Sequence, residues 1–281
     1  MKLLIIGHSV FDTIESNGKL TKGAGGIYYT ISALNRIKSS DDKIFLCSQY
    51  DDTTYRHFKD QFDLVEKDFL RKVKKIPRVH LNLNKERERH ESYENISTSL
   101  DLDYHQLNQF DGILINMITG FDISLDQLEL IRNNFSGIIY IDIHTLSRGL
   151  EQNFKRNFRL IPEFSEWANK LDIIQANENE IFTLSEKKTE KEIVRELFLS
   201  GVKIVCITKG ERGAIAYFND KKQQLSFCVN TTKIENVNAV GCGDVFGAVF
   251  FYNYIKTKDF RLSLENAVNE ATLMLKKNIN N

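Results

Sequence analysis

Six short apolar runs, separated by stretches with helical periodicity, constrain the fold of this 281-residue chain more than any other feature. Each run is apolar at successive positions, which is typical of parallel strands covered by helices on both faces. Alternating strands and helices over this length predict an α/β fold, with a mostly parallel sheet between two layers of helices. The runs are KLLIIG (2–7), KIFLCS (43–48), GILINM (112–117), GIIYID (137–142), LDIIQA (171–176) and VKIVCIT (202–208), and helices are predicted at 26–38, 51–61, 124–133, 162–170, 188–200 and 261–277.

Two segments depart from this pattern. Residues 9–22 and 76–98 are polar and alternating, with a turn signal at Asn17-Gly18, and they predict exposed strands and hairpins. We interpret them as a small β-strand lid attached to the main sheet. No linker rich in glycine and serine divides the chain, so we predict a single domain over residues 1–281.

Charge, hydropathy and cysteine usage exclude several classes of function. Lys plus Arg equals Asp plus Glu at 38 each, so no global field favours nucleic acid or an anionic membrane as a partner. The apolar run at the N-terminus is far too short to span a membrane. The four cysteines are far apart in the sequence, which indicates neither a zinc site nor a disulfide framework and predicts a reducing cytoplasm.

The segment NAVGCGDVFGAVFF (238–251) places two glycines and an aspartate directly before an apolar helix. The first N–H groups of a helix lack intrahelical acceptors and carry the positive end of its dipole, so they favour an anion. Gly241 and Gly243 let a phosphate approach the backbone, and Asp244 is the candidate base that accepts a proton from a substrate hydroxyl. The alternative is that Asp244 only begins the helix and the glycines only form a turn.

This segment resembles the C-terminal signature Asp-Thr-x-Gly-Ala-Gly-Asp of the ribokinase-like (PfkB) family of carbohydrate kinases. The match lies in the last four positions, Gly241 to Asp244. The resemblance implies a three-layer α/β/α sandwich with a β-strand lid. It also implies that Gly241, Cys242 and Gly243 supply the amides of an anion hole and that Asp244 is the catalytic base.

Two upstream segments extend the resemblance to the phosphate donor. ITKGERGAIAY (207–217) is similar to the family's Thr-x-Gly-x-x-Gly turn along ATP and places Thr208, Gly210 and Gly213 on it. QANENEIFTL (175–184) is similar to the Asn-x-x-Glu motif that organises Mg²⁺ and its waters, here Asn177 and Glu180. The alternative for this pair is a capping box, in which Asn177 caps a helix and Glu180 completes the cap.

The substrate side of the resemblance lies near the N-terminus. Asp12 follows the first strand, as does the family aspartate that binds sugar hydroxyls, and Gly25 and Gly26 match a Gly-Gly element that opens a helix. Tyr29 follows that element, and the position of a family glutamate after run 112–117 has Asn116 nearby. These residues are the candidate substrate site. The tyrosines 28 and 29 replace polar groups that hold ribose, which disfavours ribose itself.

Two further positions depart from the family signature. Its Asp-Thr is Asn238-Ala239 here, so a charge and a hydroxyl are missing beside the anion hole, where a monovalent cation is a third implied cofactor besides ATP and Mg²⁺. Cys242 replaces an alanine, and a thiol at a helix N-terminus is either acidified and reactive or buried and inert.

We therefore predict an ATP-dependent phosphotransferase that acts on a hydroxyl of a small sugar or polyol. A nucleoside kinase of the same family is the alternative, because Tyr28 and Tyr29 suit a planar base. A metabolite-binding sensor with weakened catalysis is the alternative from another class, suggested by Asn238-Ala239. Pairing of two copies through the lid, giving a homodimer, is a further hypothesis.

Overall fold

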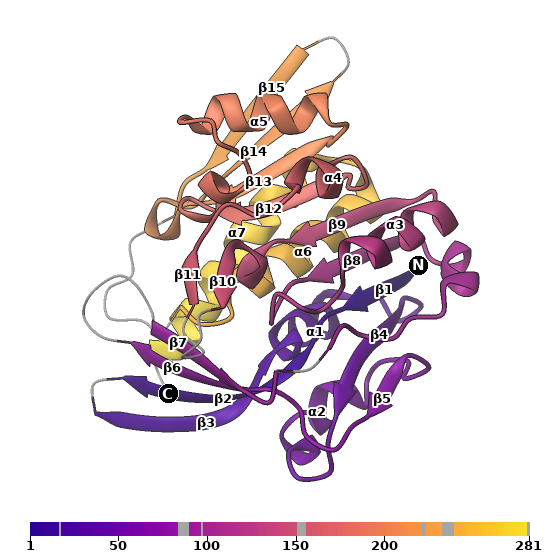
Figure 1. Ribbon diagram of the computed structural model, residues 1–281, viewed down its shortest axis with the longest axis vertical. Coiled ribbons are helices and arrows are strands. Elements are labelled where there is room, and N and C mark those ends of the chain that lie inside the picture. The colour runs from indigo at the N-terminus through magenta and orange to yellow at the C-terminus, as the bar shows by residue number, and fades with distance from the viewer. Residues whose placement is uncertain are drawn as a thin grey trace.

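A central sheet of nine strands organises the part of the chain that the computed structural model describes, which is residues 1–16, 18–83, 90–96, 98–150, 156–220, 223–231 and 239–279 (Figure 1). Its order is β15-β14-β13-β12-β9-β8-β1-β4-β5, and all neighbours are parallel except the pairs that involve β14. The strands are β1 (Lys2–Ile6), β4 (Lys43–Tyr50), β5 (Leu70–Lys72), β8 (Gly112–Asn116), β9 (Ile138–Asp142), β12 (Ile173–Asn177), β13 (Ile204–Thr208), β14 (Ala214–Asp220) and β15 (Gln223–Val229). All six apolar runs are strands of this sheet, as predicted.

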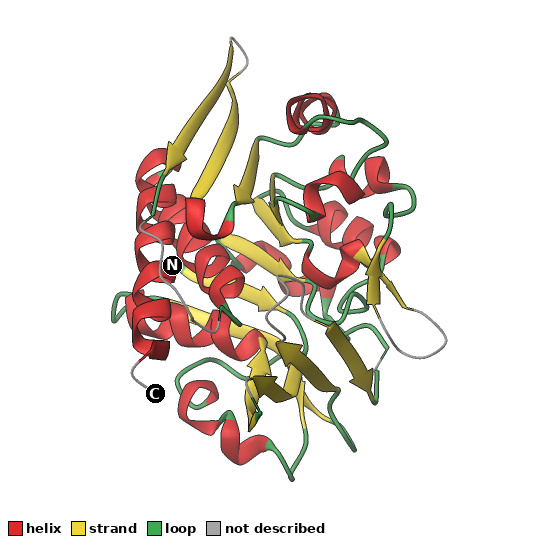
Figure 2. Cartoon of the chain, turned by 90° about the vertical axis from the view of Figure 1, so that its left-hand side faces the viewer, coloured by secondary structure: helices red, strands yellow, loops and turns green. Residues whose placement is uncertain are grey.

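Helices cover both faces of the sheet, as Figures 1 and 2 show. Leu3 and Ile5 share a buried cluster with α1, α6 and α7, whereas Leu4 and Ile6 face a cluster formed with α3, α4 and α5. Because side chains alternate along a strand, β1 is buried on both faces only when both helical layers are present. The helices are α1 (Ile27–Ile37), α2 (Lys59–Phe62), α3 (Leu125–Asn134), α4 (Phe164–Ala168), α5 (Glu190–Leu199), α6 (Cys242–Thr257) and α7 (Phe260–Ile279). None of these described helices is long and apolar enough to cross a membrane.

The helix predicted at 51–61 is wrong over most of its length. The structure has only a 3₁₀ turn, Tyr55–His57, followed by the short α2. The Asp51 carboxylate accepts hydrogen bonds from the backbone N–H groups of Thr53, Thr54 and Ile76. A side chain that binds nearby backbone in this way competes with a helix and favours a turn.

A second, four-stranded sheet forms the small lid. Its order is β3-β2-β6-β7, and its strands are β2 (Ser9–Ser16), β3 (Lys19–Gly26), β6 (Arg78–Leu83) and β7 (His90–Glu94). Residues 17, 84–89 and 97 of the predicted lid segments lie outside the described residues. The lid strand β3 continues to Gly26, so Gly25 and Gly26 end a strand immediately before α1 begins.

The inner face of the lid sheet is apolar. Val10, Val79, Leu81 and Tyr93 pack in a cluster with Ile118, which lies just beyond the end of β8. The Tyr93 hydroxyl donates a hydrogen bond to the Ile118 carbonyl at 3.1 Å. The lid is therefore held against the carboxyl ends of the central strands, where open α/β sheets bind their ligands.

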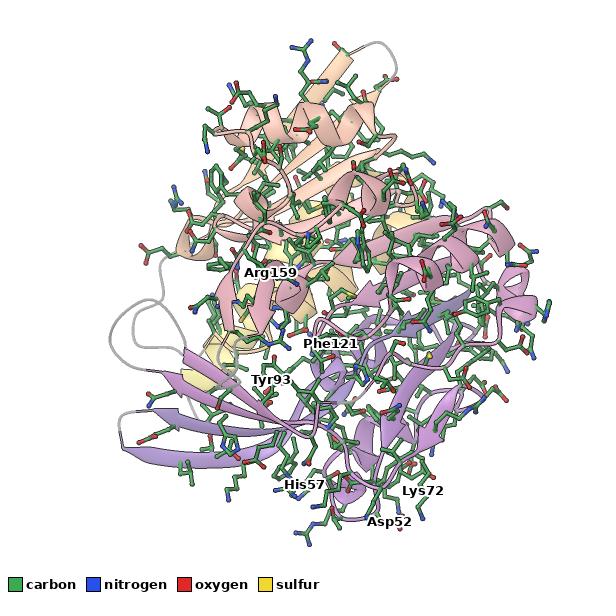
Figure 3. All side chains as sticks on the ribbon, viewed as in Figure 1. Asp52, His57, Lys72, Tyr93, Phe121 and Arg159 are labelled. Carbon is green, nitrogen blue, oxygen red and sulfur yellow. The ribbon has the colours of Figure 1, made fainter. Side chains whose placement is uncertain are left out.

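A short hairpin that the sequence analysis did not predict, β10 (Arg148–Leu150) and β11 (Arg156–Phe158), supports this packing. The Arg156 guanidinium lies 4.8 Å from the ring centroid of Tyr93 and 5.4 Å from that of Phe121. Both aromatic residues are labelled in Figure 3. The hairpin thus connects the lid sheet with the loop that follows β8.

Candidate active site

The first turn of α6 is built around Gly241. This residue has φ +84°, and a Cβ added to it would lie 2.6 Å from the Tyr29 ring. A side chain would therefore be both strained and in collision, so the turn requires glycine. The turn is closed by hydrogen bonds from Cys242 N–H to the Ala239 carbonyl at 3.1 Å and from Val245 N–H to the Gly241 carbonyl at 3.0 Å.

The amides of Gly243 and Asp244 lie between these two bonds, at the positive end of the α6 dipole. An anion bound at this end of the helix would face the positive end of its dipole. The Cys242 amide, which the sequence analysis assigned to the anion hole, is engaged with Ala239 in this conformation. It would have to exchange that carbonyl for a ligand oxygen.

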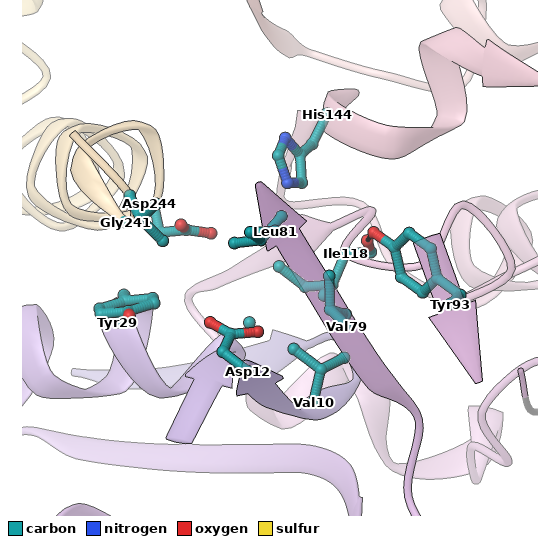
Figure 4. Close-up of a pocket in the computed structure, with 12 residues that line it drawn as sticks. Val10, Asp12, Tyr29, Val79, Leu81, Tyr93, Ile118, His144, Gly241 and Asp244 are labelled. Atoms are coloured by element: carbon teal, nitrogen blue, oxygen red, sulfur yellow. Dashed lines mark hydrogen bonds between the residues drawn. The ribbon is translucent and has the colours of Figure 1, made fainter. Parts of the chain in front are cut away.

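An open hollow lies between the lid sheet and the beginnings of α1 and α6. Its volume, including open solvent, is about 360 Å³. Figure 4 shows the carboxylates of Asp12 and Asp244 pointing into it, with His144 on another side. The residues that line it are Val10, Asp12, Gly26, Tyr29, Val79, Leu81, Tyr93, Ile118, His144, Val240, Gly241 and Asp244.

The hollow has polar groups on one side and apolar side chains on the other. Two carboxylates and the Tyr29 hydroxyl lie toward α1 and α6, and aliphatic side chains of the lid lie across from them (Figure 4). His144 has a positive φ of 25°, which is uncommon for a residue other than glycine and occurs often at functional sites. This arrangement suits a small ligand with hydroxyl groups on one edge and apolar surface on another.

The Asp12 carboxylate occupies space that a side chain at Gly25 would fill. A Cβ on Gly25, in the neighbouring strand β3, would overlap the Asp12 carboxylate. Asp12 is 4% exposed, so its carboxylate is almost fully removed from water. A ligand hydroxyl that donates to this carboxylate would be bound in a desolvated environment, where hydrogen bonds to charged groups are strong.

Tyr29 lies beside both aspartates. Burial raises the pKa of its hydroxyl well above the ordinary value, and the negative charges of Asp12 and Asp244 raise it further. The hydroxyl therefore stays protonated at any physiological pH and can donate a hydrogen bond to a ligand. Tyr28, in contrast, donates to Asp60 and packs edge-on against Phe58, away from the hollow.

The surroundings of Cys242 favour a buried, inert thiol over an acidified, reactive one. Burial and, to a smaller extent, the charge of Asp244 raise the pKa of its thiol to about 12. A raised pKa keeps a thiol protonated near neutral pH, which favours the inert alternative. Asn238, the first departure from the family signature, lies outside the described residues, and Ala239 is exposed.

Asn116 is not among the residues that line the hollow. Its side-chain amide lies behind Asp244 and donates a hydrogen bond of 2.7 Å to Asp244 Oδ1. Asn116 ends β8, and Asp244 is in the first turn of α6, 128 positions later. The sequence analysis found both residues but not their contact.

Gln175 is a site residue that the sequence analysis missed. It is 3% exposed, and its amide donates to the Gly243 carbonyl at 3.0 Å and to Asp142 Oδ2 at 2.9 Å, so it attaches the first turn of α6 to the central sheet. The Tyr140 hydroxyl donates to Gln175 Oε1. A signal was present, since Gln175 is a long polar residue within the apolar run LDIIQA.

Asn177 and Glu180 hold each other through backbone bonds. The Asn177 side chain accepts from Glu180 N–H at 2.9 Å, and Glu180 Oε2 accepts from Asn177 N–H at 2.8 Å. These reciprocal bonds are those of the capping interpretation, although the residue directly before the 3₁₀ turn, Glu180–Thr183, is Asn179. The described residues contain no cluster of three metal-ligating side chains. The hard oxygens of this pair are still chemically suited to a hydrated Mg²⁺, which keeps most of its waters.

The candidate nucleotide segment follows β13. Thr208 ends the strand, Gly210 begins a 3₁₀ turn with φ +55°, and Gly213 follows with φ +87°. Gly210 is exposed and a Cβ there would meet nothing within 4 Å, so the backbone of this turn is open to a ligand. The segment is separate from the hollow that holds Asp12 and Asp244.

Comparisons with known proteins relate the chain to carbohydrate and nucleoside kinases. Residues 148–278 match the model of the pfkB family carbohydrate kinases. A 5-dehydro-2-deoxygluconokinase of Clostridium botulinum (strain Eklund 17B / Type B) is 23% identical over 199 residues, which cover 65% of this chain and 56% of that protein. A cytidine kinase of Thermococcus kodakarensis is 26% identical over 112 residues, 40% of each chain. The chain thus matches little more than half the length of the first of these relatives.

Solved structures match over nearly the whole chain. A sulfate complex of a pyrophosphate-dependent kinase in the ribokinase family has a TM-score of 0.78 at 13% identity, covering 98% of this chain and 95% of that one. Arabidopsis thaliana ribokinase complexed with ribose and ATP has a TM-score of 0.74 at 14% identity, covering 98% and 92%. These likenesses confirm the predicted fold class, a three-layer sandwich with a small lid sheet.

Proposed function

We propose that this chain, which belongs to the pfkB family of carbohydrate kinases, transfers a phosphoryl group from MgATP to a hydroxyl of a small sugar or polyol. One observation carries the proposal. The Asp244 carboxylate lies at the N-terminus of α6 and points into the same hollow as Asp12. A base and an anion-binding helix end thus meet beside a group that can bind hydroxyls.

Asp244 orients the attacking hydroxyl and accepts its proton. In phosphoryl transfer the transition state is loose and its charge lies on the transferred group, so a weak base suffices. The amides of Gly241, Cys242 and Gly243 are assigned to hold that group against the positive end of α6, and the Cys242 amide takes part once it releases the Ala239 carbonyl. The closed lid excludes water that would otherwise accept the phosphoryl group.

The substrate is bound by groups of two kinds. Asp12 accepts hydrogen bonds from its hydroxyls, Tyr29 donates one, and Gly25 and Gly26 let it approach the backbone. The aliphatic lid residues Val79 and Leu81 cover its apolar surface. Because two carboxylates face the hollow, a neutral sugar or polyol is favoured over a phosphorylated one.

The phosphate donor is assigned to the turn after β13. ATP lies along Thr208, Gly210 and Gly213, and Mg²⁺ is held through water by Asn177 and Glu180, where it neutralises charge on the phosphates. Support comes from a putative ribokinase II of E. coli, solved with ATP and Mg²⁺, which has a TM-score of 0.74 at 18% identity over 98% of this chain and 92% of that one. Binding of a monovalent cation stays a prediction. Ala239, beside the anion hole, offers no side-chain oxygen to such a cation.

A nucleoside is the second candidate substrate, and the match to a cytidine kinase is the observation that favours it. Pyrophosphate is a second candidate donor, because one of the matching structures is of a pyrophosphate-dependent kinase with myo-inositol. We place the enzyme in the cytoplasm, supported by four free cysteines of which two are buried.

The test is turnover of wild type and Asp244→Asn with MgATP or magnesium pyrophosphate against a panel of sugars, polyols, sugar acids and nucleosides. We expect one acceptor to give turnover and Asp244→Asn to lose about 10²–10⁴-fold in kcat, since a general base contributes that much. Asp126→Asn is the matched control, because Asp126 is an exposed aspartate in the first turn of α3. Undiminished turnover in Asp244→Asn would refute the role of the base, and ligand binding without turnover would favour the sensor.

A further inference from the structure

We infer that Asn116 is a positioning residue for the catalytic base, an inference that rests on the role proposed for Asp244. The sequence analysis assigned Asn116 to the substrate. In the structure it is 1% exposed and its amide nitrogen contacts Asp244 Oδ1 at 2.7 Å. It therefore acts on the carboxylate that performs the chemistry and not on the substrate itself.

The contact fixes the rotation of the Asp244 carboxylate. An aspartate side chain rotates about two bonds, and its terminal torsion is broad, so without a partner the carboxylate samples many orientations. A hydrogen bond of 2.7 Å to one oxygen, from a donor on the rigid β8 strand, selects one of them. Holding a reacting group in a productive orientation is a large part of what an enzyme contributes to rate.

The side-chain amide of Asn116 is oriented so that its nitrogen faces Asp244. Its nitrogen donates to Asp244 Oδ1 and to Thr30 Oγ1, the latter at 3.1 Å. Its oxygen is buried and has no hydrogen-bond partner among the described residues. Leaving a buried acceptor unpaired is unfavourable, and such groups in native structures often mark a functional site. Turning the amide over would place its oxygen against the Asp244 carboxylate, which repels it.

Three elements are joined at this point. Asn116 ends β8, Thr30 is in the second turn of α1, and Asp244 is in the first turn of α6. α1 begins directly after the lid strand β3, at Gly26. Asn116 thus connects the proposed base with α1, the helix that follows the lid strand β3. The position of the Asp244 carboxylate therefore depends on the central sheet as well as on α6.

The experiment measures kcat and KM for Asn116→Ala and Asn116→Asp with the acceptor found for the wild type. We expect Asn116→Ala to lose about 10–100-fold in kcat, as supporting residues around reacting groups typically do, while KM for the acceptor stays within about twofold. Asn35→Ala is the matched control. The Asn35 amide is also in a donating contact, with the Gln61 carbonyl at 3.0 Å, and its oxygen is also buried without a partner.

Asn116→Asp keeps the size of the side chain and changes only its chemistry. At neutral pH it places a second carboxylate against Asp244, and kcat should fall below that of Asn116→Ala. At acidic pH the new carboxyl is protonated and donates the lost hydrogen bond, so the pH of maximal kcat should move down. A residue with a merely structural role would not produce this shift.

The outcomes separate the two proposals. If Asp244→Asn keeps turnover, the proposed base is wrong. If Asp244→Asn is inactive but Asn116→Ala keeps the kcat of the wild type, only the positioning role is wrong. If Asn116→Ala raises KM by the same factor as it lowers kcat, the inference fails. It also fails if Asn116→Ala lowers the melting temperature together with kcat and Asn116→Asp shows no shift in the pH of maximal kcat, because Asn116 is then structural.

Discussion

At the level of single residues, the hollow depends on positions where a side chain is missing as much as on those where one is present. Asp12 occupies the space above Gly25, and Tyr29 occupies the space above Gly241. The carboxylate and the aromatic ring are therefore placed by neighbouring glycines in β3 and in the turn before α6. In the proposed function the two positions serve different sides of the reaction, the substrate hydroxyls and the anion.

Gly25→Ala is expected to weaken substrate binding. The new Cβ would overlap the Asp12 carboxylate, so Asp12 has to move and loses its hydrogen bonds to the substrate. Hydrogen bonds to a charged group contribute about 1.5–3 kcal/mol, so KM should rise by about tenfold or more. Gly23→Ala is the control, because Gly23 lies two residues earlier in the same strand and a Cβ there meets nothing within 4 Å. Equal KM values for the two variants would contradict this account of Asp12.

At the level of elements, the join between β1 and the lid is fixed by a buried, hydrogen-bonded pair of side chains. His8 follows β1, and its ring nitrogen lies 2.9 Å from Asp122 Oδ1, with both side chains 0% exposed. The Asp122 carboxylate also accepts from the backbone N–H groups of His8 and Thr119, at 2.7 and 2.9 Å. The loop after β8 is thereby attached to the point where the chain leaves the central sheet for the lid.

Asp122→Asn should destabilise the fold in a pH-dependent way. Burial alone would raise the pKa of Asp122, but the attraction of His8 and the hydrogen bonds from His8 and Thr119 outweigh it and lower the pKa. A lowered folded-state pKa stabilises the protein above the unfolded value of about 3.9 and loses that effect as pH falls through the folded-state value. Hydrogen bonds to a charged group contribute about 1.5–3 kcal/mol, which sets the scale of the loss expected at neutral pH.

Urea unfolding of wild type and Asp122→Asn, at neutral pH and at a series of values below pH 4, tests this. The difference in free energy of unfolding should be full at neutral pH and shrink in acid. A difference that is constant over the whole range would mean that the asparagine is costly for its shape and not for its charge.

At the level of the whole molecule, the lid sheet has one face in the hollow and one in solvent. Its edge strand β3 carries Leu20, which is 58% exposed, and Lys22, which is also exposed. An unpaired strand edge is a template for pairing with another chain. The homodimer through the lid therefore stays a prediction with a defined location.

Light scattering of the full chain tests the dimer. We expect the mass of two chains for the wild type and of one chain for Leu20→Lys, since a charge on the edge strand opposes pairing. Leu199→Lys is the control, because Leu199 is 83% exposed at the end of α5, outside the lid. A wild-type mass of one chain would contradict the hypothesis.

The six central strands, the lid and the motif at Gly241–Asp244 were readable from the sequence, whereas the hairpin of β10 and β11 was not. These features depend on local patterns, which are continuous apolar runs, runs that alternate between polar and apolar residues, helical periodicity, and glycines before an apolar helix. The helix predicted at 51–61 failed because the Asp51 side chain binds backbone at Thr53, Thr54 and Ile76, and the last of these lies 25 positions away. A window of sequence does not contain such a contact.

The tertiary structure alone decided what each polar side chain contacts. Asn116 was a substrate candidate from its place after an apolar run, and only the packing of α6 on the sheet put it against Asp244. The sequence left two alternatives for Cys242, and the burial of its thiol, which raises the thiol pKa, favours the inert one. The physical reason is the same in both cases. Pattern along a chain fixes which residues are buried, whereas the partners of a buried polar group can come from distant segments, as with Asn116 and Asp244, which are 128 positions apart.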